Sequence, residues 1–201
     1  PMAIGPTRVG KDLVLNDWAG ATDLAAYKGS VYQDAASAII EEVSLGAASN
    51  RSTTLVVLSP CSAVADALHR APWIAQHIVV VAMGGSLWHG DNGTGQPFAE
   101  WNIAGDVPSA QAMYAAQWKL TTAPLDTAGA AQVSGKEFTQ LLDCKSKSAI
   151  VRALLDMYEA WLPLCPWPAP KHGPFGPADL GNASSVIYDA LAAMLLDVWN
   201  P

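Results

Sequence analysis

Glycine, carboxylate and amide residues follow the most apolar run of the sequence. The run 78–83 leads into Gly84 and Gly85, and Glu100 and Asn102 follow it. Glycines let a backbone turn sharply and approach a ligand, and a carboxylate with an amide offers acceptors and donors that suit vicinal hydroxyls. The cluster predicts a ligand site, with an ordinary solvated turn as the alternative.

Two other runs end in polar residues in the same way. The β-branched run 53–58 ends at Ser59, and the run 119–125 ends at Asp126. In open α/β sheets, ligands bind beyond the carboxyl ends of the strands. We therefore expect these strand ends to form one binding edge, with the stretch after residue 83 richest in functional groups.

Helical and strand-like periods alternate along the chain and position these residues. We expect strands at 53–58, 76–83 and 119–125, helices at 31–45, 62–69, 108–117, 135–161 (broken near Cys144) and 184–199, and irregular stretches at 1–29 and 163–181. Asn182 or Ser184 is the candidate N-cap of the last helix. The alternation predicts an α/β fold with an open, mostly parallel sheet and helices on both faces, and residues 1–201 are expected to form a single domain.

The composition disfavours several classes of protein. With 201 residues, of which 51% are hydrophobic and 14% charged, the chain can bury a full core. Its formal net charge of −7 disfavours a sequence-independent grip on nucleic acid, and no apolar run is long enough to cross a bilayer.

The cellular compartment stays open between cytoplasmic and secreted. The first residue is Pro1, which predicts an upstream start of translation or processing, and no signal peptide is visible. Sequons begin at Asn50, Asn92 and Asn182, and they permit glycosylation if the protein is secreted.

Ordered motifs surround the glycine-rich turn. They read Met83-Gly-Gly-Ser86, Gly90 to Gly93, Ala99-Glu-Trp-Asn-Ile103 and Asp106. In this order they resemble the core signature of the inosine–uridine preferring nucleoside hydrolases, with Trp101 in place of the usual Phe and Val107 splitting the usual Asp-Pro pair. Further family segments resemble residues 31–43, 54–68, 124–127 and 188–190.

The resemblance implies a nucleoside hydrolase-like fold and an activity. That activity is hydrolysis of the N-glycosidic bond of ribonucleosides by a water bound to Ca²⁺. By resemblance, Asn92, Glu100 and Asn102 hold the ribose, and Met83 and Trp101 belong to the same substrate site.

The resemblance also assigns roles near the chain's end. Asp189 and the backbone carbonyl of Leu58 would be metal ligands, and Tyr188 stands where the family often has a His that protonates the leaving base. Plainer readings are a solvated acid for Asp189 and a core aromatic for Tyr188. Cys61 follows a strand end with no His placed beside it, which favours a small buried residue over a nucleophile.

One family feature has no match in these 201 residues. The family's Asp-x-Asp-x-x-x-Asp-Asp motif supplies the catalytic base and most metal carboxylates, whereas Asp12, Asp17 and Asp23 are scattered. Without it Asp189 lacks carboxylate partners, and Tyr188, with an ordinary pKa of about 10, is a poor general acid.

The resemblance implies that these 201 residues begin after the family's amino-terminal segment, so we expect the first strand or strands to be missing from them. A parallel sheet without them has an open edge, which we expect a homo-oligomer contact, a partner chain or residues 1–29 to cover. Two functions stay open: a ribonucleoside hydrolase completed by an upstream or partner segment, or a non-catalytic descendant that binds a nucleoside, a sugar or a protein.

Overall fold

The computed structural model describes residues 1–5, 23–90, 95–161 and 183–199. The chain forms two compact units, one made of residues 1–7, 29–131 and 187–201 and the other of residues 8–28 and 132–186. The assignment of the whole chain to a single domain stays a prediction.

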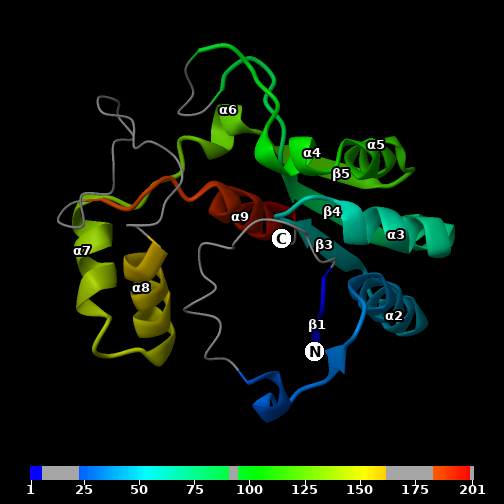
Figure 1. Ribbon diagram of the computed structural model, residues 1–201, viewed down its shortest axis with the longest axis horizontal. Helices are drawn as coiled ribbons and strands as arrows, with labels where there is room; N and C mark the ends of the chain where they lie inside the picture. Colours follow the sequence, from blue (N-terminus) through cyan, green and yellow to red (C-terminus); the bar gives the residue numbers. More distant parts are fainter. Residues whose placement is uncertain (6–22, 91–94, 162–182, 200–201) are drawn as a thin grey trace. The chain divides into compact units, whose positions relative to one another are not determined.

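A parallel sheet lies at the centre of the first unit (Figure 1). Its strands are β3 (Thr53–Val57), β4 (Ile78–Met83) and β5 (Lys119–Ala123), in the order β3-β4-β5. The register sets Thr53 opposite Ile78 and Val79 opposite Lys119. A second parallel pair joins β1 (Met2–Ala3) to β2 (Val31–Tyr32). The open parallel sheet predicted from the sequence is confirmed.

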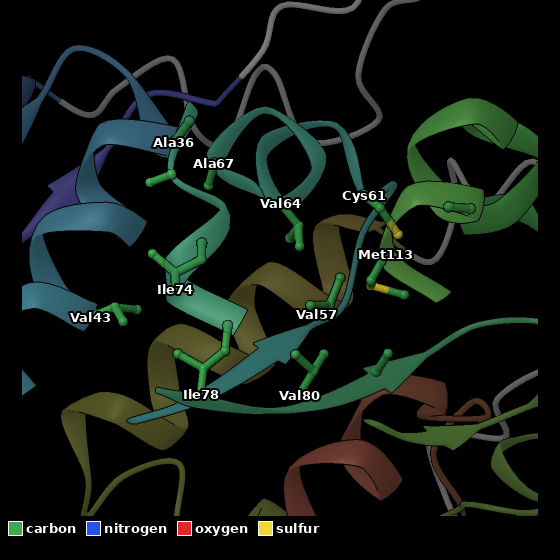
Figure 2. Packing of buried hydrophobic residues seen from close by; sticks show 13 residues of the cluster. Ala36, Val43, Val57, Cys61, Val64, Ala67, Ile74, Ile78, Val80 and Met113 are labelled. Carbon is green, nitrogen blue, oxygen red and sulfur yellow. The ribbon is translucent and has the colours of Figure 1, made fainter. Parts of the chain in front are cut away.

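Alternate residues of β4 face two separate cores. Ile78 and Val80 pack beneath α2 (Ala35–Ala48), α3 (Ser62–Arg70), the 3₁₀ helix η2 (Pro72–Gln76) and α5 (Val107–Ala115), as Figure 2 shows in part. Val81 and Met83 pack on the other face with α6 (Leu125–Ala128) and α9 (Tyr188–Trp199). Because β4 is buried on both faces, it reads as one continuous apolar run, and helices do cover both faces of the sheet.

Several predicted boundaries were wrong by a few residues. Residues 31–32 belong to β2, and α2 begins at Ala35 because the Asp34 carboxylate accepts the backbone N–H groups of Ala36 and Ser37. The strand predicted from residue 76 begins at Ile78, since η2 occupies the residues before it. The break near Cys144 is confirmed: α7 (Gly135–Asp143) and α8 (Ala149–Trp161) are separate helices.

The last helix starts later than predicted. It begins at Tyr188, and Ser184 is not its N-cap. Instead the Ser184 hydroxyl accepts the Val133 N–H at 3.0 Å and its own N–H donates to the Val133 carbonyl at 2.8 Å. Asn182, the other candidate cap, lies outside the described residues. Short helices η1 (Leu24–Ala26) and α4 (Trp101–Gly105) complete the described elements.

The helices of the part of the chain that the structure describes are all too short or too polar to cross a membrane. Among the described strands, β3 and β5 are the edges of the larger sheet, and β1 pairs with β2. What covers the edge of β3 stays a prediction.

Candidate functional site

The carboxyl end of β4 brings together three of the predicted substrate residues. Met83 ends the strand, and the turn after it leads to Glu100 and Asn102, which are only 4% and 8% exposed. The side-chain amide of Asn102 donates to the Met83 carbonyl at 3.2 Å. Polar side chains this deeply buried are held by specific partners, so this strand end is built around them and is not a solvated turn.

Glu100 also has a structural role that was not predicted from the sequence. It is the N-cap of α4: one carboxylate oxygen accepts the Asn102 N–H at 2.8 Å, and the other accepts the Ile103 N–H at 3.2 Å. The second oxygen also accepts the Gly85 N–H at 3.1 Å. A carboxylate has about four acceptor positions, and these backbone N–H groups occupy three of them.

Glycine is required in the turn that approaches Glu100. Gly85 has a φ of 89°, in the left-handed region that favours glycine. A Cβ atom on Gly84 would lie 3.4 Å from both the Glu100 carboxylate and the Ile103 side chain. The sharp turn expected at the two glycines is present at Gly85, and the approach of this backbone to a ligand stays a prediction.

Two more of the predicted residues, one for the substrate and one for the metal, have exposed side chains. Trp101 begins α4 between the two buried polar residues, and its side chain is exposed. Leu58 follows β3 directly and is also exposed. Asn92 lies outside the described residues.

Asp189 and Tyr188 open α9, the helix that packs on β4. Burial, and then the negative charge of Glu100, raise the pKa of the Asp189 carboxyl above its ordinary value. Tyr188 is half-buried and packs against the cluster that contains Val81 and Met83. Asp189 is thus electrostatically coupled to Glu100, while Tyr188 contributes to the core.

The raised pKa of Asp189 predicts a pH dependence. At pH values between the ordinary pKa of an Asp and the raised pKa of Asp189, the folded chain binds more protons than the unfolded chain. The contribution of Asp189 to stability therefore falls as pH rises above about 4. We expect Asp189→Asn to raise the urea midpoint of the 201-residue chain at pH 7, and the gain to shrink toward pH 4. Asp66→Asn, at an exposed ion pair with Arg70, is the control and should give no gain. An equal gain at both pH values would contradict the assignment.

The described residues do not by themselves fit a calcium ion. Ca²⁺ takes six to eight oxygen ligands, and no three His, Cys, Asp or Glu side chains come together as a metal site in the part of the chain that the structure describes. The Glu100 carboxylate is already engaged by backbone N–H groups. Asp189 and the Leu58 carbonyl are too few ligands, and no step below is routed through a metal.

Cys61 is a buried thiol, as predicted. Burial first, and then the charges of Asp106 and Glu100, raise its pKa, which keeps the sulfur protonated. Asp106 itself caps α5 by accepting the Ser109 N–H at 3.2 Å, and it also accepts the Ser62 hydroxyl at 2.5 Å. Asp106 therefore joins α3 to α5, and the buried, protonated thiol of Cys61 favours a packing role.

Asp126 is the residue of this region that sequence reasoning missed. Its carboxylate accepts the backbone N–H groups of Leu87, Trp88 and His89 at 2.8, 2.8 and 2.9 Å. These bonds, with that of Leu87 the largest, lower the pKa of Asp126 to about 2. Its position just after a strand end was visible in the sequence, but its partners, almost forty residues away, were not.

Gly90 tests how tightly the loop after β4 is packed. A Cβ atom there would lie 2.8 Å from the Phe98 ring and 2.9 Å from the Gln96 carbonyl, and a backbone carbonyl cannot easily give way. We expect Gly90→Ala to lower the free energy of unfolding by about 2 kcal/mol. Gly5→Ala, where a Cβ meets nothing within 4 Å, should be close to neutral in the same urea titration. Equal midpoints for both variants would show that the loop is loose.

A shallow cavity of about 590 Å³ lies elsewhere, in the second unit. It is lined by Leu142, Asp143, Lys145, Ser146, Arg152 and Asp156. Lys145 is paired with Asp156 at 3.0 Å and with Glu159 at 2.8 Å. None of the predicted site residues borders it, so the polar strand end and not this cavity is the candidate site.

The fold is that of solved nucleoside hydrolases. The structure is similar to an inosine–uridine preferring nucleoside hydrolase from Bacillus anthracis (19% identity, TM-score 0.60, 90% of this chain and 52% of that one). It is also similar to a purine-preferring ribonucleoside hydrolase from Gardnerella vaginalis (21% identity, TM-score 0.64, 96% of this chain and 61% of that one). A third similar structure is a plant nucleoside hydrolase (21% identity, TM-score 0.52, 68% of this chain and 40% of that one).

The chain belongs to the inosine–uridine preferring nucleoside hydrolase family, whose model matches residues 8–197. The predicted family is thereby confirmed. No individually curated protein gives a significant sequence match. The chain spans 52% and 61% of the length of the first two solved relatives.

Proposed function

We propose that this chain supplies the sugar-holding part of a ribonucleoside hydrolase. It would take part in hydrolysis of the N-glycosidic bond when a segment upstream of Pro1, or a partner chain, completes the site. The observation that supports this most is the buried pair Glu100 and Asn102 at the end of β4, in a chain of this family.

Each site residue has a task in this proposal. Glu100 accepts a ribose hydroxyl in its remaining acceptor position, and Asn102, tied to the Met83 carbonyl, lies beside it. Trp101 and Met83 flank the sugar. Asn92 would join them by family resemblance. As the base leaves, the ribose becomes oxocarbenium-like, and fixed hydroxyl contacts hold it in the reacting geometry.

The remaining steps belong to residues that these 201 do not contain. Water must lose a proton to a carboxylate as it attacks the sugar carbon, and the acidic motif of the family would supply that base. Asp189 and the Leu58 carbonyl would be this chain's share of a calcium site only in such a completed protein. Tyr188 would lie on the side of the leaving base.

A non-catalytic binding protein is the second candidate. The loop between β4 and α4 exposes Leu87, Trp88 and Phe98, and exposed apolar side chains of this size mark contact surfaces. In this reading the chain binds a nucleoside, a sugar or a protein without turnover, or pairs with a second copy of itself.

Base release from inosine and uridine separates the two candidates. The assay compares this chain with the protein extended by the coding sequence upstream of Pro1, with and without Ca²⁺. Hydrolysis requires that the extended protein release free base while this chain alone only binds. Binding without release by both would favour the binding protein, and no binding by either would overturn both readings of the site.

A further inference from the structure

We propose that Asp126 is a positioning residue of the nucleoside site: its carboxylate fixes the loop 86–89 and, through Gly85, the place of Glu100. The inference rests on the proposed function and deepens it. Asp126 lies on α6, directly after β5, and so comes from a different strand end than the loop it holds.

The contacts of the carboxylate are specific. One oxygen accepts the Leu87 N–H, and the other accepts the N–H groups of Trp88 and His89. Hydrogen bonds to an ionised carboxylate are shorter and stronger than neutral ones. The neighbouring Leu125 N–H adds a bond to the Gly85 carbonyl at 2.9 Å, so the start of α6 is bound to the start of the loop by backbone as well.

Within the described residues, the other contacts of this loop are few. Leu87 and Trp88 are 58% and 72% exposed, so their side chains do not anchor it in a core. The Ser86 hydroxyl donates to the His89 carbonyl at 2.7 Å and accepts the Phe98 N–H at 3.2 Å, which closes the loop on itself. Among the described residues, the Asp126 carboxylate thus supplies the three hydrogen bonds that join residues 87–89 to α6.

Gly85 transmits the position of the loop to the sugar-holding residues. Its N–H donates to Glu100 while its carbonyl accepts from Leu125. Only Ser86 separates Gly85 from the first amide that Asp126 binds. We therefore expect a shift of the loop to disturb the Gly85 N–H, which is one of the three backbone donors that hold the Glu100 carboxylate.

Two substitutions of Asp126 should loosen the loop to different degrees. In Asp126→Asn, the remaining carbonyl oxygen still suits Trp88 and His89, but the new NH₂ group faces the Leu87 N–H, donor against donor. Asp126→Ala removes all the bonds. Amide hydrogen exchange of the 201-residue chain should speed up at Gly85 and at residues 87–89 by about tenfold in the first variant and further in the second. Asp66→Asn, the same substitution at an exposed ion pair, should leave the hydrogen-exchange rates of these amides unchanged.

Inosine affinity, measured by calorimetry on the folded protein, is the second readout. Asp126→Asn should weaken it by about tenfold or more, whereas a merely structural role would lower the unfolding midpoint and leave the affinity intact. Unchanged amide exchange, or faster exchange with unchanged affinity, would overturn the inference. If the wild-type chain binds no inosine, the proposed function fails, and the amide exchange alone then decides whether Asp126 holds the loop.

Discussion

Replacing Glu100 by alanine is expected to abolish nucleoside binding and to lower the free energy of unfolding by about 3 kcal/mol. The variant removes the N-cap of α4, which costs about 1 kcal/mol, and leaves the N–H groups of Gly85, Asn102 and Ile103 without their acceptor. A buried donor left unsatisfied costs about 1 to 3 kcal/mol. Urea denaturation measures the stability loss, and calorimetry with inosine measures the binding, which should weaken at least about a hundredfold.

Two further variants separate the roles of Glu100. Glu100→Gln keeps one carbonyl oxygen but turns an NH₂ group toward at least one of the backbone N–H groups that the carboxylate accepts. It should therefore lose part of the stability, less than Glu100→Ala, and bind inosine more weakly because an acceptor for a sugar hydroxyl is gone. Glu42→Ala, at an exposed position of α2, should change neither quantity. Wild-type binding in Glu100→Ala would show that this carboxylate is a helix cap and nothing more.

Replacing Ile74 by alanine is expected to cost about 3 kcal/mol of stability, because truncation of a buried Ile or Leu leaves a cavity. Ile74 is fully buried in η2, where Figure 2 shows it between the helices and the sheet residues Ile78 and Val80. The matched control is Ile150→Ala on α8, since Ile150 is 83% exposed; its unfolding free energy should change by less than about 0.5 kcal/mol. Equal urea midpoints for the two variants would contradict the core described above.

The sequence was most informative where one local signal decides the structure. The run 78–83 is β-branched and apolar on both faces, so the central strand was predictable, and the turn after it followed from Gly84 and Gly85. Where two signals compete, the prediction was wrong. Val31 fits the helical period of the residues after it, yet it pairs with β1, because Asp34 fixes the helix start beyond it.

Long-range hydrogen bonds could not be predicted in the same way. Glu100 was identified by its family motif, but its role as a cap depends on where α4 begins, which no periodic pattern in five residues can show. Asp126 was expected at the binding edge, but its contacts were not, because a side chain that binds distant backbone amides leaves no pattern in the sequence. The 3₁₀ helix that contains Ile74 was not predicted for a related reason: it is short and apolar, like the strand that follows it, so the sequence does not separate the two elements.

The most direct test of the sugar-holding role is a comparison of inosine with 2′,3′-dideoxyinosine in calorimetry on the 201-residue chain. If buried Glu100 and Asn102 hold the ribose hydroxyls, inosine should bind at least about tenfold more tightly, because the hydroxyl-free ligand leaves polar groups of the site unpaired. The preference should disappear in Glu100→Gln. Equal affinity of the wild-type chain for the two ligands, or failure to bind either, would contradict the account.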